Sequence, residues 1–194
     1  IFFGPSGTGK TTAANILAKA AGKTLHKLNA TSAGLADVKN VISESSSLLG
    51  ADGVLLYLDE MQYFNKKQQQ SLLEYIENGR ITLIASTTEN PYFYIYPAIV
   101  SRCAVFEFKS IGAAELKRAV LRGAALLESE TGRKISVSDA ALSMIVTAAA
   151  GDARRALGLY ENIAAVYDTV TEETVRDFLP EVMGMGGFDK DGDG

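Results

Sequence analysis

The sequence has little of the residue types that build disulfide-bonded folds and zinc sites. Its 194 residues include one cysteine and one histidine, which are Cys103 and His26. A single cysteine excludes an intramolecular disulfide and fits a reducing compartment. With no CxxC pair and no His/Cys cluster, the sequence also excludes a structural zinc site and His-pair metal motifs. We interpret Cys103 as a small apolar strand residue and His26 as a strand residue at a solvated edge.

A long hydrophobic run and an excess of positive charge are also absent. No stretch approaches the roughly 18 apolar residues of a membrane-spanning helix, and the start lacks the basic region of a secretion signal. The 23 acidic residues outnumber the 19 basic ones, which gives a net charge of −4. That balance argues against a generally basic nucleic-acid-binding surface but allows a local basic patch. We expect a soluble, cytoplasmic protein with no membrane partner.

Short apolar runs alternate with helical patterns over residues 1–109. The continuous apolarity of the runs predicts strands that are buried on both faces. The alternation of strands and helices predicts an α/β domain with a mostly parallel sheet flanked by helices. The predicted strands are residues 1–3, 24–28, 54–58, 81–85 and 105–108, and the clearest predicted helices are residues 11–21 and 68–77.

After Ser110 the strand-like runs stop. Four amphipathic patterns predict a small all-helical domain over residues 110–180, and Pro180 is expected to help end the last helix. The four predicted helices are residues 113–127, 138–149, 153–167 and 170–179. Residues 181–194 have the glycine-rich and acidic composition of a linker. Because the chain also starts inside a predicted strand, we expect it to be the catalytic middle of a longer protein.

A phosphate-binding loop follows the first predicted strand. Residues 4–11 fit the pattern GxxxxGK[ST], and a predicted helix comes directly after them. The glycines let successive backbone N–H groups point at phosphate oxygens, and the helix N-terminus adds partial positive charge. Lys10 is expected to reach the β- and γ-phosphates, and the Thr11 hydroxyl to ligate Mg²⁺. The predicted nucleotide-binding residues are Gly4, Pro5, Ser6, Gly7, Thr8, Gly9, Lys10, Thr11, Thr12 and Asp59.

Polar side chains end two of the predicted buried strands. Asp59 and Glu60 follow residues 54–58, and adjacent charges there are costly unless a cation is present. We predict that Asp59 holds Mg²⁺ through its water shell and that Glu60 is the general base that orients the attacking water. Residues 86–90 follow the strand 81–85, at the sheet edge where ligands bind in open α/β sheets. One of their polar groups is expected to contact the γ-phosphate or the attacking water.

Six motifs together resemble the AAA+ ATPases of the clamp-loader branch. Within that branch they are most similar to the replication-associated recombination protein A (RarA, also called MgsA) family, over nearly the whole chain. The segments Thr87–Pro91 and Gly151–Leu157 are the most specific to that family. The motifs are Gly4–Thr11, Asp59-Glu60, Tyr63–Gln70, Thr87–Pro91, Ser101–Cys103 and Gly151–Leu157.

The resemblance implies a fold and further site residues. The fold is an AAA+ P-loop NTPase domain followed by a helical lid. Thr88, or its neighbour Thr87, is implied as sensor 1. Arg102 is implied as an arginine finger that enters the ATP site of the adjacent subunit, and Arg154 as sensor 2, which reaches the γ-phosphate from the lid. Positive charge of this kind stabilises a phosphoryl-transfer transition state.

The resemblance also implies a function. We expect a DNA-dependent ATPase that hydrolyses ATP with Mg²⁺ at subunit interfaces and acts on DNA at stalled or gapped replication forks. Its expected partners are single-stranded or gapped DNA, replication-fork proteins and copies of itself in a tetramer or ring. The segment that helps to hold adenine and the C-terminal oligomerisation region are expected outside these residues.

Three alternatives stay open at this point. They are a Holliday-junction branch-migration motor, a non-hydrolysing ATP-switch subunit of a clamp loader and, more weakly, a P-loop kinase. Lys39, Lys66 and Lys67 are the candidate DNA contacts, because basic and aromatic residues such as Tyr63 and Phe64 can together track a nucleic-acid backbone. The alternative is a solvated helix start whose aromatic side chains pack on the core.

Overall fold

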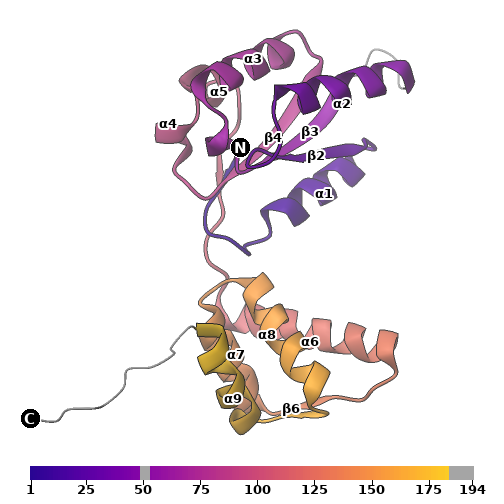
Figure 1. Ribbon diagram of the computed structural model, residues 1–194, viewed down its shortest axis with the longest axis vertical. Helices are drawn as coiled ribbons and strands as arrows, with labels where there is room; N and C mark the ends of the chain where they lie inside the picture. The colour runs from indigo at the N-terminus through magenta and orange to yellow at the C-terminus, as the bar shows by residue number, and fades with distance from the viewer. Residues whose placement is uncertain (49–52, 184–194) are drawn as a thin grey trace, which may run out of the picture. The chain divides into compact units, whose positions relative to one another are not determined.

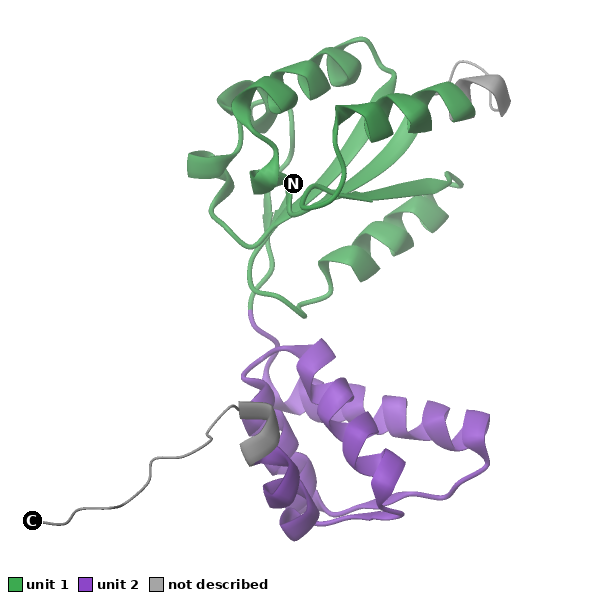
Figure 2. Cartoon of the chain, in the orientation of Figure 1, with its two compact units in different colours: residues 1–109 green, residues 110–194 purple. Residues whose placement is uncertain are grey.

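The computed structural model describes residues 1–48 and 53–183. The chain divides into two compact units, residues 1–109 and residues 110–194 (Figure 2). The linker expected at residues 181–194 lies, from residue 184 onward, outside the described residues.

Unit 1 is built on a five-stranded parallel sheet with the strand order β2-β3-β4-β1-β5 (Figure 1). The strands are β1 (Phe2–Phe3), β2 (Leu25–Asn29), β3 (Val54–Asp59), β4 (Ile81–Thr87) and β5 (Phe106–Glu107). β3 is buried along nearly its whole length, which explains its unbroken apolar sequence. The predicted α/β fold with a parallel sheet is confirmed.

Helices cover both faces of this sheet. The helical segments of unit 1 are α1 (Lys10–Ala20), α2 (Leu35–Leu48), the 3-10 turn η2 (Met61–Tyr63), α3 (Lys66–Glu77), α4 (Pro91–Tyr94) and α5 (Pro97–Val100). Ala14 of α1 packs in one cluster with Phe2 and Tyr57. Leu56 and Leu58 belong to a second cluster that includes residues of α2, α3 and α5. Successive residues of β3 therefore contribute to opposite faces, as strand geometry requires.

Unit 2 packs four helices around one apolar core. They are α6 (Ala113–Thr131), α7 (Asp139–Ala149), α8 (Ala153–Val166) and α9 (Glu172–Met183). Tyr160 and Ile163 of α8 are fully buried in this core together with Ile145 of α7. Among the helices of residues 1–48 and 53–183, none combines the length and hydrophobicity that a membrane span requires.

Two details of unit 2 differ from the sequence predictions. Short strands β6 (Ser136–Val137) and β7 (Thr169–Val170) pair in parallel, so the unit is not purely helical. Strands of two residues are too short to produce a recognisable period. The sequence predicts an end of the last helix near Pro180, but α9 continues to Met183. A proline in the last turn removes a single helical hydrogen bond, and the helix can continue past it.

Gly4 fills a narrow space between the ends of three strands. Its backbone N–H donates to Thr87 O at 3.1 Å, beyond the end of the β1–β4 pairing. Its φ is 138°, and a Cβ atom placed on it would lie 1.9 Å from the carbonyl oxygen of Phe108. Only glycine tolerates both this conformation and this close approach.

We predict that Gly4→Ala lowers the free energy of unfolding by about 3 kcal/mol, because overpacking adds to backbone strain. The matched control is Gly22→Ala, because Gly22 has a φ of 65° but no atom within 4 Å of the position that a Cβ would take. Gly22→Ala should lower the free energy of unfolding by about 1 kcal/mol, from backbone strain alone. Urea unfolding measures both, and equal losses would contradict the steric explanation.

Candidate nucleotide site

The candidate site lies at the carboxyl edge of the parallel sheet. The loop of residues 4–9 runs from the end of β1 to the start of α1. β4 lies between β1 and β3, and its register pairs Thr87 with Phe3 and Ala85 with Leu58. The ends of β1, β3 and β4 therefore meet, and the side chains that follow them gather at one edge, where ligands bind in open α/β sheets.

The phosphate-binding loop has the backbone that an anion requires. Gly4, Gly7 and Gly9 have φ values of 138°, 66° and 95°. Gly9 is the N-cap of α1 and has no side chain to occupy the first N–H groups of the helix. The Thr8 hydroxyl donates to Pro5 O at 2.8 Å and closes the loop. The start of α1 thus presents backbone donors and the positive end of the helix dipole, with the exposed Thr12 in its first turn.

The ammonium group of Lys10 lies inside this loop. Its Nζ donates to the carbonyl oxygens of Gly4 and Pro5, both at 2.7 Å. Lys10 is only 8% exposed, and a buried ammonium group needs such partners. The loop therefore holds a positive charge beside its own backbone donors, which suits an anionic phosphate.

A network of hydroxyl groups connects Asp59 to Thr11. Asp59 Oδ1 accepts hydrogen bonds from Ser86 Oγ and, at 3.1 Å, from the backbone N–H of Glu60. Tyr57 Oη lies 3.0 Å from Thr11 Oγ1, 2.8 Å from Ser86 Oγ and 3.4 Å from Asp59 Oδ1. Burial raises the pKa of Tyr57, while its hydrogen bonds with Ser86 and Thr11 oppose that rise. The phenol therefore stays protonated and links the two residues predicted to hold Mg²⁺.

Glu60 occupies a left-handed backbone conformation directly after β3. Its φ and ψ are 53° and 44°, and within the described residues only Ala150 is another non-glycine residue with positive φ. This backbone conformation costs a non-glycine residue roughly 1 to 2 kcal/mol of strain. Gln62 Nε2 donates to Glu60 Oε2 at 2.5 Å, whereas Gln62 Oε1 is buried without a hydrogen-bond partner among the described residues. Both the turn and Gln62 fix where the Glu60 carboxylate lies.

The two threonines at the end of β4 have different surroundings. Thr87 is 1% exposed, and its hydroxyl accepts a hydrogen bond from Glu89 N at 3.0 Å. Thr88 is the first residue beyond the strand and is exposed. Of the two candidates for sensor 1, Thr88 is the one whose side chain is available at the carboxyl edge.

Arg102 lies at the amino edge of the sheet, where the parallel strands begin. Its guanidinium forms an ion pair with Glu77 Oε1 at 2.6 Å and donates to Ala98 O at 2.8 Å. Glu77 precedes β4 and Arg102 precedes β5, so both lie near the amino ends of the strands. The structure therefore does not bring Arg102 to the phosphate-binding loop of its own chain.

Arg154 belongs to unit 2. It is exposed in the first turn of α8, whose N-cap Asp152 accepts a hydrogen bond from Arg155 N at 3.0 Å. The cap fixes the start of the helix and leaves the Arg154 side chain in solvent.

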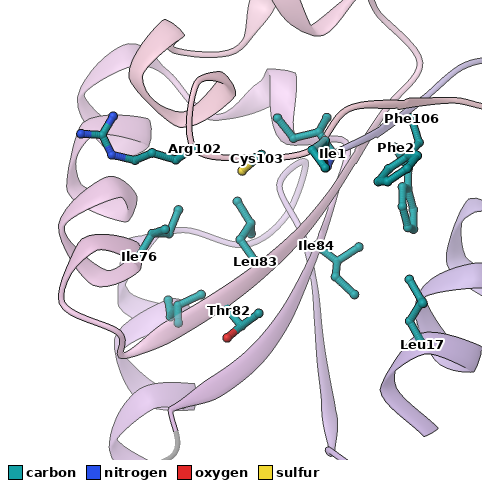
Figure 3. Close-up of a pocket in the computed structure, with 12 residues that line it drawn as sticks. Ile1, Phe2, Leu17, Ile76, Thr82, Leu83, Ile84, Arg102, Cys103 and Phe106 are labelled. Atoms are coloured by element: carbon teal, nitrogen blue, oxygen red, sulfur yellow. Dashed lines mark hydrogen bonds between the residues drawn. The ribbon is translucent and has the colours of Figure 1, made fainter. Parts of the chain in front are cut away.

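A cavity of about 420 Å³ lies on the β1–β4 part of unit 1, away from the phosphate-binding loop. Figure 3 shows it lined mostly by apolar side chains, with Arg102 at the rim and pointing away from it. No residue of the phosphate-binding loop lines it, and its cationic side chain, Arg102, pairs with Glu77 and points away from the cavity. The cavity is therefore not the nucleotide site predicted from the sequence.

The candidate DNA contacts divide into exposed and buried residues. Lys39, Lys66 and Lys67 are exposed, and Tyr63 is 64% exposed. Phe64 is 2% exposed and belongs to the core. For Phe64, the alternative of an aromatic side chain packed on the core therefore holds.

Cys103 and His26, the only cysteine and histidine of the sequence, lie outside the candidate site. Cys103 packs against the apolar core just before β5, and burial raises the pKa of its thiol. His26 is half-buried on β2, the strand at one edge of the sheet.

Three site residues were missed from the sequence. Tyr57 lies two positions before Asp59 on the same strand face, a spacing that could have identified it. Ser86 belonged to a group of polar residues among which the sequence did not choose. Gln62 gave no signal, because its contact with Glu60 depends on the left-handed turn.

Comparisons with known proteins agree with this geometry. Residues 1–111 match the ATPase family associated with various cellular activities (AAA). The chain is 36% identical to the replication-associated recombination protein A of Coxiella burnetii, over 100% of this chain and 45% of that protein. It is 35% identical to the Bacillus subtilis protein of the same name, over 100% of this chain and 47% of that protein. The chain thus spans less than half the length of these relatives.

Among solved structures, the chain is similar to the RuvB Holliday junction branch migration motor of Thermotoga maritima. The TM-score is 0.73 at 24% identity, and the match covers 97% of this chain and 63% of that chain. This likeness shows the fold alone. The relatives confirm the resemblance that the motifs indicated, and the chain belongs to the AAA family of ATPases.

Proposed function

We propose that the protein binds ATP with Mg²⁺ at the carboxyl edge of unit 1, hydrolyses it, and couples hydrolysis to work on DNA at stalled or gapped replication forks. The observation that carries the proposal is the convergence of Lys10, Thr11, Asp59 and Glu60 at one edge of the sheet. Tyr57 links Thr11 to Asp59 by hydrogen bonds, and the backbone N–H of Glu60 donates to Asp59. Replication-fork proteins are the expected partners.

The residues present fit Mg²⁺. Thr11 and Asp59 offer a hydroxyl and a carboxylate oxygen, which this hard cation prefers, and Tyr57 holds them together. Within the described part of the chain, no group of three or more His, Cys, Asp or Glu residues could form a metal site by itself. A site of few protein ligands suits an ion that is shared with phosphates. When bound, Mg²⁺ would neutralise charge on the β- and γ-phosphates.

The loop and Lys10 bind the triphosphate in this proposal. The first N–H groups of α1 and the loop donate to phosphate oxygens, and the Lys10 ammonium exchanges its carbonyl partners for the β- and γ-phosphates. Glu60 accepts a proton from the water that attacks the γ-phosphorus, and ADP leaves. The strained turn and Gln62 orient the carboxylate for that step.

Three further residues complete the site in this proposal. Thr88 contacts the γ-phosphate or the attacking water as sensor 1. Arg154 acts as sensor 2 from unit 2, which serves as a lid. Arg102 acts in the site of a neighbouring subunit, because it lies at the amino edge of its own sheet. The protein therefore works as a homo-oligomer, a tetramer or a ring.

The names of the relatives support a role in replication-associated recombination. Exposed lysines at the start of α3 support contact with DNA. The similarity to RuvB concerns the fold and does not favour branch migration as the activity. The presence of Lys10, Asp59 and Glu60 favours hydrolysis over a non-hydrolysing ATP switch.

We predict that Glu60→Gln binds ATP normally but turns it over at least about a hundredfold more slowly, because the amide cannot accept the proton of the attacking water. Phosphate release measures turnover, and a fluorescent ATP analogue measures binding. Glu74→Gln, an exposed carboxylate on α3, is the matched control and should keep the wild-type rate. Wild-type turnover by Glu60→Gln would remove Glu60 from the mechanism.

We predict that Arg102→Ala lowers ATP turnover by about 10³-fold or more. Mixing it with Lys10→Ala should restore part of the activity, since a mixed interface can join an intact Lys10 to an intact Arg102. Glu77→Ala breaks the same exposed ion pair, which is worth at most about 1 kcal/mol, and should leave turnover intact. If mixing restores nothing, or if Glu77→Ala loses as much activity, Arg102 does not act across the interface.

A further inference from the structure

An unusual group of aromatic side chains is exposed beside the candidate site. Tyr92, Phe93 and Tyr94 of α4 are 63%, 82% and 53% exposed, and Tyr63 at the end of η2 is 64% exposed. Isolated exposed apolar residues are normal on a protein surface, but three of these four are consecutive in the chain, and such a concentration indicates an interaction site. We call these four residues the aromatic platform.

Gln69 joins the two segments that carry the platform. Its buried side chain donates to Phe64 O at 2.8 Å and to Tyr94 O at 3.3 Å, and accepts from Tyr96 N at 2.6 Å. The residue after Tyr63 and the last residue of α4 therefore lie on either side of one amide group. Asn90 also caps α4 by accepting from Tyr92 N at 3.0 Å. The backbone that carries the platform is thus held in place before any partner binds, which lowers the entropic cost of binding.

Positive charge lies next to the platform. Lys66 and Lys67 begin α3 and are exposed, and Lys66 Nζ lies 6.0 Å from the centre of the Tyr96 ring. Glu89 is the exposed acid between Thr88 and α4, and the two lysines outnumber it. Cations track phosphates, and aromatic rings stack on bases that are not already stacked in a duplex. An apolar protein surface would match the rings but would leave the lysines without partners.

We propose that the aromatic platform stacks on the bases of single-stranded DNA while Lys66 and Lys67 contact its phosphates. This inference rests on the proposed DNA-coupled ATPase. α4 begins three residues after Thr88, so DNA on the platform binds to the same short segment that carries the predicted sensor 1.

The absence of tryptophan from the chain makes a direct test available. Phe93→Trp places one fluorophore on the platform, and Leu126→Trp places one at an exposed position of α6, 64% exposed, as the control. We predict that an oligo(dT) strand quenches the emission of Phe93→Trp at the same midpoint as its binding, and leaves Leu126→Trp unchanged. Phe93→Ser should weaken oligo(dT) binding about tenfold, because one stacked base contributes about 1 to 3 kcal/mol, whereas Leu126→Ser should bind like wild type.

The possible outcomes separate the proposals. Equal quenching of both tryptophans, or normal binding by Phe93→Ser, would overturn the platform while leaving the ATPase proposal intact. A wild-type protein that does not bind oligo(dT) would overturn the DNA-coupled function and the platform together. Emission of Phe93→Trp that changes with protein concentration, without DNA, would assign the patch to a second copy of this chain instead. Stronger quenching by oligo(rU) than by oligo(dT) would overturn the assignment to DNA.

Discussion

The hydrogen bonds accepted by the Asp59 carboxylate hold the candidate site together. A charge at the end of a buried strand is costly unless it is paired or hydrogen-bonded, and here Ser86 of β4 and the Glu60 N–H both donate to it. Tyr57 extends the network to Thr11 at the start of α1. One carboxylate therefore connects β3, β4 and α1, and the phosphate-binding loop is placed relative to Asp59 by this network and by the bond from Gly4 N to Thr87 O.

The same parallel sheet separates two sets of charged residues. Groups that follow strands gather at the carboxyl edge, which explains the positions of Lys10, Asp59 and Glu60. Arg102 and its partner Glu77 precede strands and lie at the amino edge. The direction of the chain through the sheet thus gives each copy a candidate nucleotide site on one edge and an arginine on the other. In the proposed oligomer, that separation makes each site dependent on a neighbour.

The sequence predicted the features whose signal is local. β3 was predicted because a strand buried on both faces has a continuous apolar run, and β4 because its run is similar, although Thr82 is exposed. The phosphate-binding loop was predicted because its glycines and Lys10 have a fixed spacing. α2 was missed because its second half is rich in serine, a weaker helix former, and α4, α5, β6 and β7 were missed because elements of two to four residues have no measurable period. The contacts of Tyr57 with Ser86, of Gln62 with Glu60 and of Arg102 with Glu77 depend on strand register, a left-handed turn and tertiary packing, which no local pattern encodes.

In the proposed function, ATP hydrolysis at the carboxyl edge of unit 1 is coupled to DNA. The most direct measurement is the ATPase rate of the wild-type protein alone and with single-stranded, gapped and fully duplex DNA of matched length. We expect single-stranded or gapped DNA to raise the rate and duplex DNA to have little effect, because paired bases cannot stack on the exposed rings of α4. A rate that no form of DNA changes would contradict the account.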